Sequence, residues 1–335
     1  MELVSSLCNN GIIPASYVHP PEARPGNLIV PLGKSIPAID LAGDRDQIQI
    51  IQAILKASEE YGFFQVINHG VSEALMDDTM DVIQEFHALS AMDKEMECSK
   101  DPNGSCKLYT SSLGYLAENF HYWRDAVAHP CHPLEERMKF WPQKPIRYRK
   151  VIGAYSIELR KLSSRILEMI CEGLGLETRY FSSALSENPK ILVNHYPPCP
   201  DPSLTLGLSK HQDPSIITLV LQGHIQGLQV LKDDQWIGVQ PLPHAFVVNM
   251  GYLLQIISNG KLKGAEHRVV TNTKDARTTI SYFVYPSSES LITPAKILAN
   301  QQNPPLYKGC KFSDFLTVYL SKAADKEAVE EYLKF

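Results

Sequence analysis

A series of short β-type segments in the second half of the chain constrains the fold more than any other feature of the sequence. From Ile191 onward, runs rich in Val, Ile, Leu, Thr and aromatic residues alternate with clusters of Gly, Pro, Asn or Asp. The runs are Ile216–Leu221, Gly227–Leu231, Trp236–Gln240, Ala245–Asn249, His267–Thr271 and Thr278–Val284. Regular short strands with such breaks are typical of an antiparallel sandwich or barrel. The sequence therefore predicts an α+β protein with a double-stranded β-helix (jelly-roll) core and flanking helices.

Helical periodicity lies mostly before this region. Apolar residues recur at helical spacing over Asp46–Tyr61, Ser72–Leu89, Arg147–Leu174 and Phe312–Ser321. Ser72 fits an N-cap, and Gly173 and Gly175 fit the end of the longest helix. Short strands are expected at Ile36–Leu41 and Phe63–Ile67, after a Pro- and Gly-rich extended arm over residues 1 to about 35. Residues 98–122 are predicted to be irregular, and we favour a functional loop there because the segment contains several aromatic residues.

The composition argues for a small-molecule partner. Of the 335 residues, 44% are hydrophobic and 21% are charged, and the formal net charge is −5, which gives no electrostatic footprint for nucleic acid or an anionic membrane. Seven scattered cysteines form no zinc-type spacing and favour a reducing compartment. The sequence shows no signal-peptide pattern and no apolar run long enough to span a bilayer, so we expect a cytoplasmic protein.

His211 and Asp213 form the first candidate site. Residues i and i+2 of a strand point to the same face, so this imidazole and carboxylate converge while Gln212 points away. His267 opens a later β run and can supply a third ligand. Two histidines and one carboxylate occupy one face of an octahedron, the arrangement used for non-haem Fe(II) oxygen chemistry. An isolated His-x-Asp pair is weak evidence, because a surface histidine beside a turn aspartate is common.

A second set of paired residues strengthens the assignment. Arg277 and Thr279 are again i and i+2 on a strand, so a guanidinium and a hydroxyl share one face and suit a carboxylate. Upstream, Asn194 and Tyr196 share one face of a short extended segment kept rigid by prolines, and either could bond the second end of a chelating acid. His195 alternates away from them and is interpreted as a packing residue.

The order of these motifs resembles one family. Four motifs are similar, in their order along the chain, to those of the plant Fe(II)/2-oxoglutarate-dependent dioxygenases. They are Asn-x-Tyr-Pro-Pro-Cys-Pro at 194–200, His-x-Asp at 211–213, His-Arg-Val at 267–269 and Arg-x-Thr at 277–279. Residues 62–70 match the N-terminal signature of this family, so the resemblance covers nearly the whole chain. Within the family, the chain resembles the hyoscyamine 6-hydroxylase-like branch at four short segments: Lys107–Tyr109, Tyr122–Trp123, Ala128–His129 and Cys131–Leu134.

The resemblance implies a complete set of cofactors and binding residues. Fe(II) would be bound by His211, Asp213 and His267. The distal carboxylate of 2-oxoglutarate would be bound by Arg277 and Thr279, with Tyr196 supporting that end and Asn194 near the chelating end. O2 would be the second co-substrate and ascorbate the reductant, with succinate and CO2 as co-products. The family default is a monomer.

The resemblance also implies a division of the chain. Residues 1–100 would form an N-terminal helical and β region, and residues 101–335 the jelly-roll catalytic domain, with a core at about 187–287. Two positions depart from the family pattern. Thr279 replaces the usual Ser, which keeps the hydroxyl and adds a methyl, so a tighter site is expected. Asn249-Met-Gly-Tyr252 replaces the frequent Asn-x-Gly-Asp, which affects the expected support of the iron site.

Substrate contacts are assigned to the irregular segment, to Trp123 just beyond it, and to two aromatic residues past the Arg277–Thr279 strand. The candidates are Lys107, Tyr109, Tyr115, Leu116, Phe120, Trp123, Phe283 and Tyr285. The alternative for each aromatic residue is ordinary core packing. Between Lys107 and Glu118 there is no acidic residue to pair with a protonated amine, so a neutral phenolic metabolite is as consistent as an alkaloid.

The leading hypothesis is therefore an oxygenase that hydroxylates an unactivated C–H bond of a small plant specialised metabolite. Desaturation, ring closure and O-demethylation use the same oxidant, and a hormone-like phenolic such as salicylate is an alternative substrate. A catalytically silent ligand binder and an iron oxidase that does not use 2-oxoglutarate are the competing classes. The intact metal-ligand triad and the Arg277–Thr279 carboxylate clamp argue against the silent binder, and Arg277 with Thr279 and Tyr196 disfavours the oxidase that does not use 2-oxoglutarate.

Overall fold

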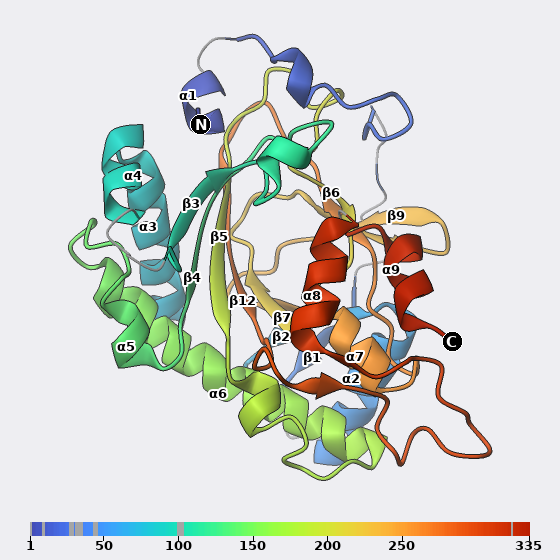
Figure 1. Cartoon of the computed structure of the whole chain (residues 1–335). Coiled ribbons are helices and arrows are strands. Elements are labelled where there is room, and N and C mark those ends of the chain that lie inside the picture. The colour runs from blue at the N-terminus through green and yellow to red at the C-terminus, as the bar shows by residue number, and fades with distance from the viewer. Residues whose placement is uncertain are drawn as a thin grey trace.

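Two β-sheets form the centre of the computed structural model, which describes residues 2–8, 11–26, 30, 36–42, 46–98, 104–322 and 324–335 (Figure 1). The major sheet has the order β1 (Ala38–Asp40), β2 (Phe63–Ile67), β10 (Phe246–Met250), β7 (Ile217–Leu221), β12 (Arg277–Phe283), β5 (Lys190–Tyr196), β4 (Asp125–Pro130) and β3 (Lys107–Thr110). The minor sheet has the order β6 (Leu208–His211), β11 (His267–Val269), β8 (Leu228–Lys232) and β9 (Gln235–Gly238). The predicted α+β jelly-roll architecture is confirmed.

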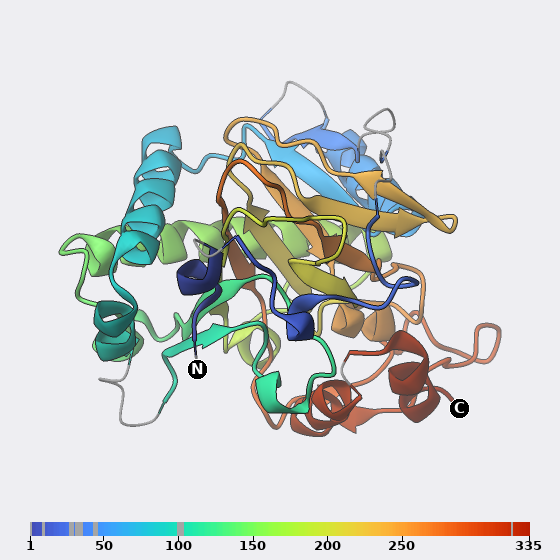
Figure 2. The same ribbon diagram turned by 90° about the horizontal axis from the view of Figure 1, so that it is seen from above.

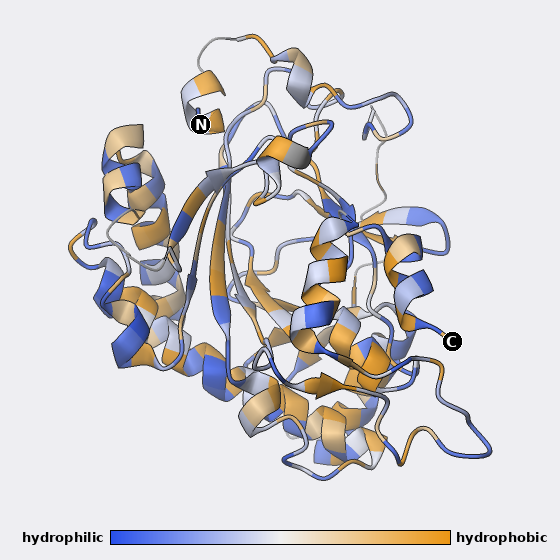
Figure 3. Ribbon diagram, viewed as in Figure 1, coloured by the Kyte–Doolittle hydropathy of each residue, from blue (hydrophilic) through white to orange (hydrophobic). Residues whose placement is uncertain are grey.

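Three helices cover one face of the major sheet. These are α2 (Gln47–Glu60), α3 (Glu73–Ala88) and α6 (Tyr148–Leu174), of which α2 and α3 both contact α6 (Figures 1 and 2). Figure 3 shows that α2 and α6 carry both hydrophobic and hydrophilic residues, as an amphipathic helix requires. Helix α6 ends at Gly175, whose φ of 71° lets its N–H bond the carbonyls of Cys171 and Glu172. The main hydrophobic core fills the space between these helices and the sheet.

The N-terminal strands complete the sheet that carries the later strands. β1 pairs in parallel with β2, and β2 pairs antiparallel with β10, so residues nearly two hundred positions apart share one sheet (Figure 2). The division of the chain at residue 100 stays a prediction. None of the helices in the described ranges is both long enough and apolar enough to cross a membrane.

Several elements differ from the sequence-based expectation. Residues 107–110 form β3 rather than irregular chain, because they pair with β4, a strand that the sequence pattern did not predict. The remaining elements are α1 (Val4–Leu7), η2 (Ala15–Tyr17), α4 (Ala91–Cys98), η3 (Tyr115–Ala117), α5 (Leu134–Met138), η4 (Ser183–Ser186), α7 (Tyr252–Ile257), β13 (Leu291–Ile292), β14 (Cys310–Lys311), α8 (Phe312–Ser321) and α9 (Lys326–Leu333). Ser72 occupies the N-cap of α3, but its side chain makes no capping hydrogen bond.

The N-terminal arm crosses the surface of the domain where it is described. Val4 and Tyr17 pack with Trp123 and Cys199 in a second, smaller hydrophobic cluster. The backbone N–H groups of Val4 and Ser5 donate to the Asp125 carboxylate at 2.8 and 2.9 Å. Some of the predicted arm and loop lies outside the described residues. This applies to residues 1, 9–10, 27–29 and 31–35 of the arm and to residues 99–103 of the loop.

Candidate metal centre and ligand cavity

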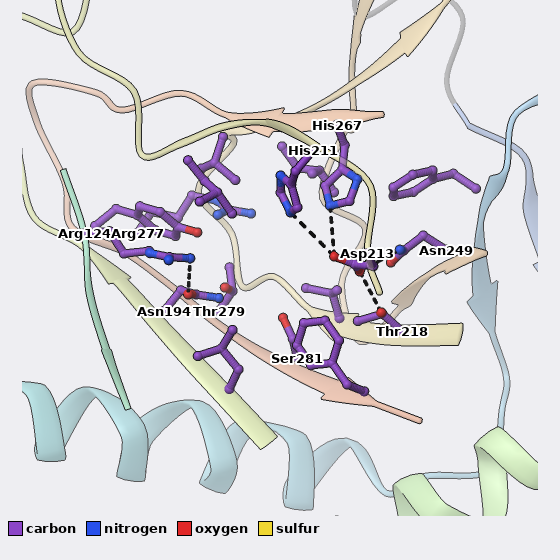
Figure 4. A pocket seen from close by; sticks show the side chains of 18 residues that line it. Arg124, Asn194, His211, Asp213, Thr218, Asn249, His267, Arg277, Thr279 and Ser281 are labelled. Atoms are coloured by element: carbon purple, nitrogen blue, oxygen red, sulfur yellow. Dashed lines mark hydrogen bonds and ion pairs between the residues drawn. The ribbon is translucent and has the colours of Figure 1, made fainter. Parts of the chain in front are cut away.

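One cavity is lined by residues of both sheets and contains all the predicted metal and carboxylate ligands (Figure 4). His211 ends β6 and His267 begins β11, and the two residues face each other in the antiparallel register of the minor sheet. Asp213 follows β6 by two residues. The register therefore brings together ligands that lie more than fifty positions apart in the sequence.

The three predicted ligands converge on one point. Oδ1 of Asp213 lies 3.5 Å from Nε2 of His211 and 3.6 Å from Nε2 of His267. One ligand atom from each residue lies within 4.8 Å of the other two, as a shared metal ion requires. Figure 4 shows both imidazole rings pointing toward the carboxylate. Gln212 points away, as predicted, and its Nε2 donates to Oε1 of Gln255 at 3.0 Å.

The other ring nitrogen of each histidine is bonded to the backbone. Nδ1 of His211 lies 2.8 Å from the carbonyl oxygen of Ser209, and Nδ1 of His267 lies 3.1 Å from that of Ala265. A carbonyl oxygen can only accept, so each Nδ1 carries the proton and each Nε2 presents a lone pair to the centre. Burial, with the neighbouring His211, lowers the pKa of His267 to about 4, which keeps this imidazole in the neutral, metal-binding form at neutral pH.

The Asp213 carboxylate is held by its second oxygen. Oδ2 accepts hydrogen bonds from the Thr218 hydroxyl at 2.6 Å and from Nδ2 of Asn249 at 2.8 Å. Burial acts to raise the pKa of Asp213, but the positive charge that His267 and His211 carry when protonated, together with the Thr218 hydroxyl, outweighs burial and lowers that pKa below its usual range. The carboxylate is therefore ionised, with Oδ1 directed at the histidines and available to a cation.

The residues predicted to bind the carboxylate lie on the adjoining part of the major sheet. In the antiparallel pair of β12 and β5, Arg277 is opposite Tyr196 and Thr279 is opposite Asn194. Alternation along both strands puts these four side chains on the cavity face. The Arg277 guanidinium is buried beside the Tyr196 ring, 5.4 Å from its centroid. Its Nε donates to the carbonyl oxygen of Ile225 at 3.0 Å and its Nη2 to Oε1 of Gln222 at 3.4 Å, and because both acceptors are neutral its positive charge is available to an anionic ligand.

Comparison with known families agrees with this geometry. Residues 187–286 match the 2OG-Fe(II) oxygenase superfamily, and residues 36–147 match the non-haem dioxygenase in morphine synthesis N-terminal family. Hyoscyamine 6-dioxygenase of Hyoscyamus niger is 45% identical over 324 residues, which cover 93% of each chain. The chain belongs to the plant 2OG-Fe(II) dioxygenases.

Other dioxygenases of this family are similar over most of their length. Flavanone 3-dioxygenase 2 of Oryza sativa subsp. japonica is 38% identical and covers 94% of this chain and 92% of its own. The crystal structure of JOX2 in complex with 2OG, Fe and JA superposes with a TM-score of 0.89 at 35% identity, covering 100% of this chain and 98% of the other. The dioxygenase therefore uses Fe(II) and 2-oxoglutarate, and its donor set fits both: two imidazoles with one carboxylate for the metal, and a buried guanidinium for the dianion.

The departure at Asn249-Met-Gly-Tyr252 leaves the support of Asp213 in place. Asn249 itself bonds Oδ2, and the Tyr252 N–H donates to the backbone carbonyl of Asp213 at 2.7 Å. The Tyr252 ring is buried, packs on Phe315 of α8 at 5.7 Å between centroids, and does not line the cavity. A Cβ on Gly251 would meet the Ser215 carbonyl oxygen at 1.9 Å, so a glycine is required there.

The predicted substrate residues are spread over several environments. Phe283 lines the cavity, and its ring stacks on Tyr285 at 5.6 Å. Trp123 is fully buried in the second hydrophobic cluster, and its Nε1 donates to the Pro197 carbonyl. Tyr115 stacks on His121 at 3.9 Å, whereas Leu116 is 98% exposed. The roles of these residues in substrate binding stay predictions.

The other three candidates also lie outside the cavity lining. Lys107 is exposed at the start of β3. Tyr109 is buried, and the Arg124 guanidinium lies 5.9 Å from its ring centroid. Phe120 is 37% exposed and packs near the His19 ring at 5.9 Å. These contacts tie the segment to the N-terminal arm and to the edge of the major sheet.

Sequence reasoning missed some residues of the cavity wall. Phe63 on β2 lies edge-to-face with His267 at 5.2 Å. Arg124 lies just before β4 and presents a second buried guanidinium to the cavity. Had β4 been recognised as a strand, its alternation would have placed Arg124 on the same face of the sheet as Ala126 and Ala128.

Proposed function

We propose that Nε2 of His211, Oδ1 of Asp213 and Nε2 of His267 bind Fe(II). We further propose that Arg277 and Thr279 bind the distal carboxylate of 2-oxoglutarate, with Tyr196 supporting that end and Asn194 near the chelating end. The observation that carries the proposal is the convergence of three ligand atoms within 4.8 Å, while Nδ1 of both histidines and Oδ2 of Asp213 are already hydrogen-bonded elsewhere. Three protein ligands leave coordination positions for the 2-oxo acid and O2.

The protein contributes binding, orientation and exclusion of water. When bound together, Fe(II), 2-oxoglutarate and O2 supply oxidative decarboxylation to succinate and CO2, coupled to oxidation of a substrate C–H bond. Arg277 is buried, so the charge-assisted hydrogen bonds by which it would neutralise the distal carboxylate are strong. Thr279 supplies a hydroxyl beside it, and the ligand is thereby held in a single orientation. No general acid or base is assigned.

The substrate is proposed to be a small plant specialised metabolite, an alkaloid or a phenolic, that is hydroxylated at an unactivated C–H bond. Leu192, Leu208 and Phe283 give the cavity an apolar wall, as a hydrophobic metabolite requires. Among the described residues, Asp213 is the carboxylate on that wall, and the proposal commits it to the metal. Glu118, which lies within the predicted loop, accepts from the hydroxyls of Ser111 and Ser112 and pairs with Nδ1 of His121. A neutral phenolic therefore fits the cavity at least as well as a cation.

Relatives of this chain are named for hyoscyamine, flavanone and mugineic acid, which supports a specialised metabolite without selecting one. Desaturation, ring closure, O-demethylation and hydroxylation of a hormone-like phenolic such as salicylate are the alternatives. The substrate contacts proposed from the sequence remain Lys107, Tyr109, Tyr115, Leu116, Phe120, Trp123, Phe283 and Tyr285. Action as a cytoplasmic monomer, with ascorbate as reductant, is part of the same proposal.

The test is O2-dependent conversion of 2-oxoglutarate to succinate with Fe(II), with and without a panel of alkaloids and phenolics. We expect a slow background that one substrate class accelerates, and a product with one added oxygen by mass spectrometry. His211→Ala and Asp213→Ala should abolish succinate formation. His244→Ala is the control, because this partly exposed histidine bonds Asp77 and does not line the cavity. Full activity in the His211→Ala, Asp213→Ala double variant would refute the metal assignment.

A further inference from the structure

Arg124 is a buried cation of the cavity wall to which no role has yet been given. It lies one residue before β4, in which Asp125 pairs with His195 and Ala126 pairs with Asn194. The Asp125 carboxylate faces the other side of the sheet, where it accepts from the backbone of Val4 and Ser5. Alternation therefore directs Arg124 into the cavity, where it is 4% exposed.

The hydrogen bonds of Arg124 are all made to neutral oxygens in the described chain. Nε and Nη2 donate to the carbonyl oxygen of Ser111 at 2.9 and 2.6 Å. Nη1 donates to Oδ1 of Asn194 at 3.0 Å, the contact drawn as a dashed line in Figure 4. Burying a guanidinium without a carboxylate partner is costly, so the burial of Arg124 at this position calls for a specific role.

The contact with Asn194 fixes the direction of an amide. A guanidinium has donors and no acceptor, so the side chain of Asn194 must turn its oxygen toward Arg124. The Nδ2 group of Asn194 is then directed away from Arg124. Asn194 itself lines the cavity and is 6% exposed, so this N–H donor is offered to whatever occupies the cavity. Without Arg124, the amide could rotate and present its oxygen, which would repel an anion.

We propose that Arg124 is a positioning residue that fixes the Asn194 amide so that its Nδ2 donates to the chelating end of the bound 2-oxo acid. This inference rests on the proposed function, which assigns the distal carboxylate to Arg277 and Thr279. Arg124 acts through Asn194 and does not itself touch the ligand. It also ties the end of β3, through Ser111, to the strand that carries Asn194.

The test measures ligand affinity in protein loaded with Mn(II), which reports binding without turnover. The dissociation constant of 2-oxoglutarate is measured by calorimetry for wild type, Arg124→Met, Asn194→Ala and the double variant. Loss of one hydrogen bond to a charged ligand should weaken binding about tenfold in each single variant. Because Arg124 acts through Asn194, the double variant should bind no more weakly than Asn194→Ala.

Two additional arms identify the mechanism. Oxalate reproduces only the chelating end of 2-oxoglutarate. Arg124→Met should therefore weaken the binding of oxalate by the same factor as the binding of 2-oxoglutarate. Asn194→Asp keeps an acceptor for Arg124 but removes the donor, so it should lose at least as much affinity as Asn194→Ala. The Mn(II) affinity and the melting temperature serve as controls for damage to the metal site or the fold.

The outcomes separate this inference from the proposed function. An unchanged 2-oxoglutarate affinity in Arg124→Met, an unaffected oxalate affinity, or multiplicative losses in the double variant would overturn the positioning role. Multiplicative losses would instead indicate a direct contact between Arg124 and the ligand. Should Arg124→Met fail to fold, Arg124→Lys replaces it, and its single ammonium should give an intermediate loss. Failure of the wild-type Mn(II) protein to bind 2-oxoglutarate would refute the proposed function itself.

Discussion

Asn249 on β10 donates a hydrogen bond of 2.8 Å to Oδ2 of Asp213, the carboxylate oxygen that does not face the histidines. The Thr218 hydroxyl on β7 donates to the same oxygen at 2.6 Å. Both donors come from central strands of the major sheet, whereas His211 and His267 belong to the minor sheet. The carboxylate therefore links the two sheets, and its orientation depends on residues that would not themselves bind the metal.

Removal of the Thr218 hydroxyl should weaken metal binding. Thr218→Val is nearly isosteric but leaves Oδ2 with one donor, and loss of such a supporting contact typically costs about 10–100-fold in metal affinity. Thr218→Ser keeps the hydroxyl and is the matched control. Anaerobic Fe(II) titration of both variants gives the comparison, and equal affinities would contradict the role assigned to this hydrogen bond.

Changes to the carboxylate clamp should raise the KM for 2-oxoglutarate more than the KM for the organic substrate. Arg277→Leu should remove the proposed buried charge-assisted contact with the distal carboxylate, with an expected loss of about 2–3 kcal/mol, or about 30–150-fold in affinity. Thr279→Val should cost about 1 kcal/mol, whereas Thr279→Ser keeps the hydroxyl and should stay near wild type. Steady-state kinetics with each substrate varied separately distinguishes these effects. A similar rise in both KM values would point to general damage of the cavity.

The local part of the site could be predicted from the sequence, because strand alternation is a property of neighbouring residues. The pairs His211 with Asp213 and Arg277 with Thr279 need only an i, i+2 relationship, and the structure places each pair on the cavity face. The helices α2, α3, α6 and α8 were predicted to within a residue or two, since amphipathic periodicity is also local. The spacing of apolar residues in a helix depends only on one face of that helix being buried, and not on which element it packs against.

The residues that depend on strand register could not be predicted in this way. Arg124, Thr218 and Asn249 meet the predicted ligands only because β4, β7 and β10 pair in a particular order within the major sheet. β4 itself has the sequence Asp-Ala-Val-Ala-His-Pro, which has little β-branched character. Its pairing with β5 and β3 outweighs this weak propensity. For the same reason, the sequence assigned the adjoining segment to irregular chain.

Tyr319 on α8 should stabilise the segment that carries His211 and Asp213. Its buried hydroxyl donates to the backbone carbonyl of Gln212 at 2.7 Å. Tyr319→Phe leaves that carbonyl without this donor and should lower the free energy of unfolding by ~1–3 kcal/mol, with weaker metal binding. Tyr332→Phe is the control, since Tyr332 is 41% exposed and its change should stay within ~0.5 kcal/mol. Urea unfolding of both variants tests this, and equal stabilities would exclude a structural role for the hydroxyl.

His129 should make the fold sensitive to acid. It is buried between Trp141 and Tyr148, and burial lowers its pKa to about 3. In the unfolded chain a histidine has a pKa of about 6.5. Protonation therefore favours the unfolded state: the stabilising contribution is complete above pH 6.5 and is lost at up to about 1.4 kcal/mol per pH unit as the pH falls toward 3. His129→Gln should reduce the slope of the unfolding free energy against pH by up to about 1.4 kcal/mol per pH unit, the contribution of one proton. Other buried histidines supply the remaining slope. Urea unfolding at pH 7, 5.5 and 4.5 measures this slope, and the same slope in variant and wild type would show that His129 is not the group that titrates.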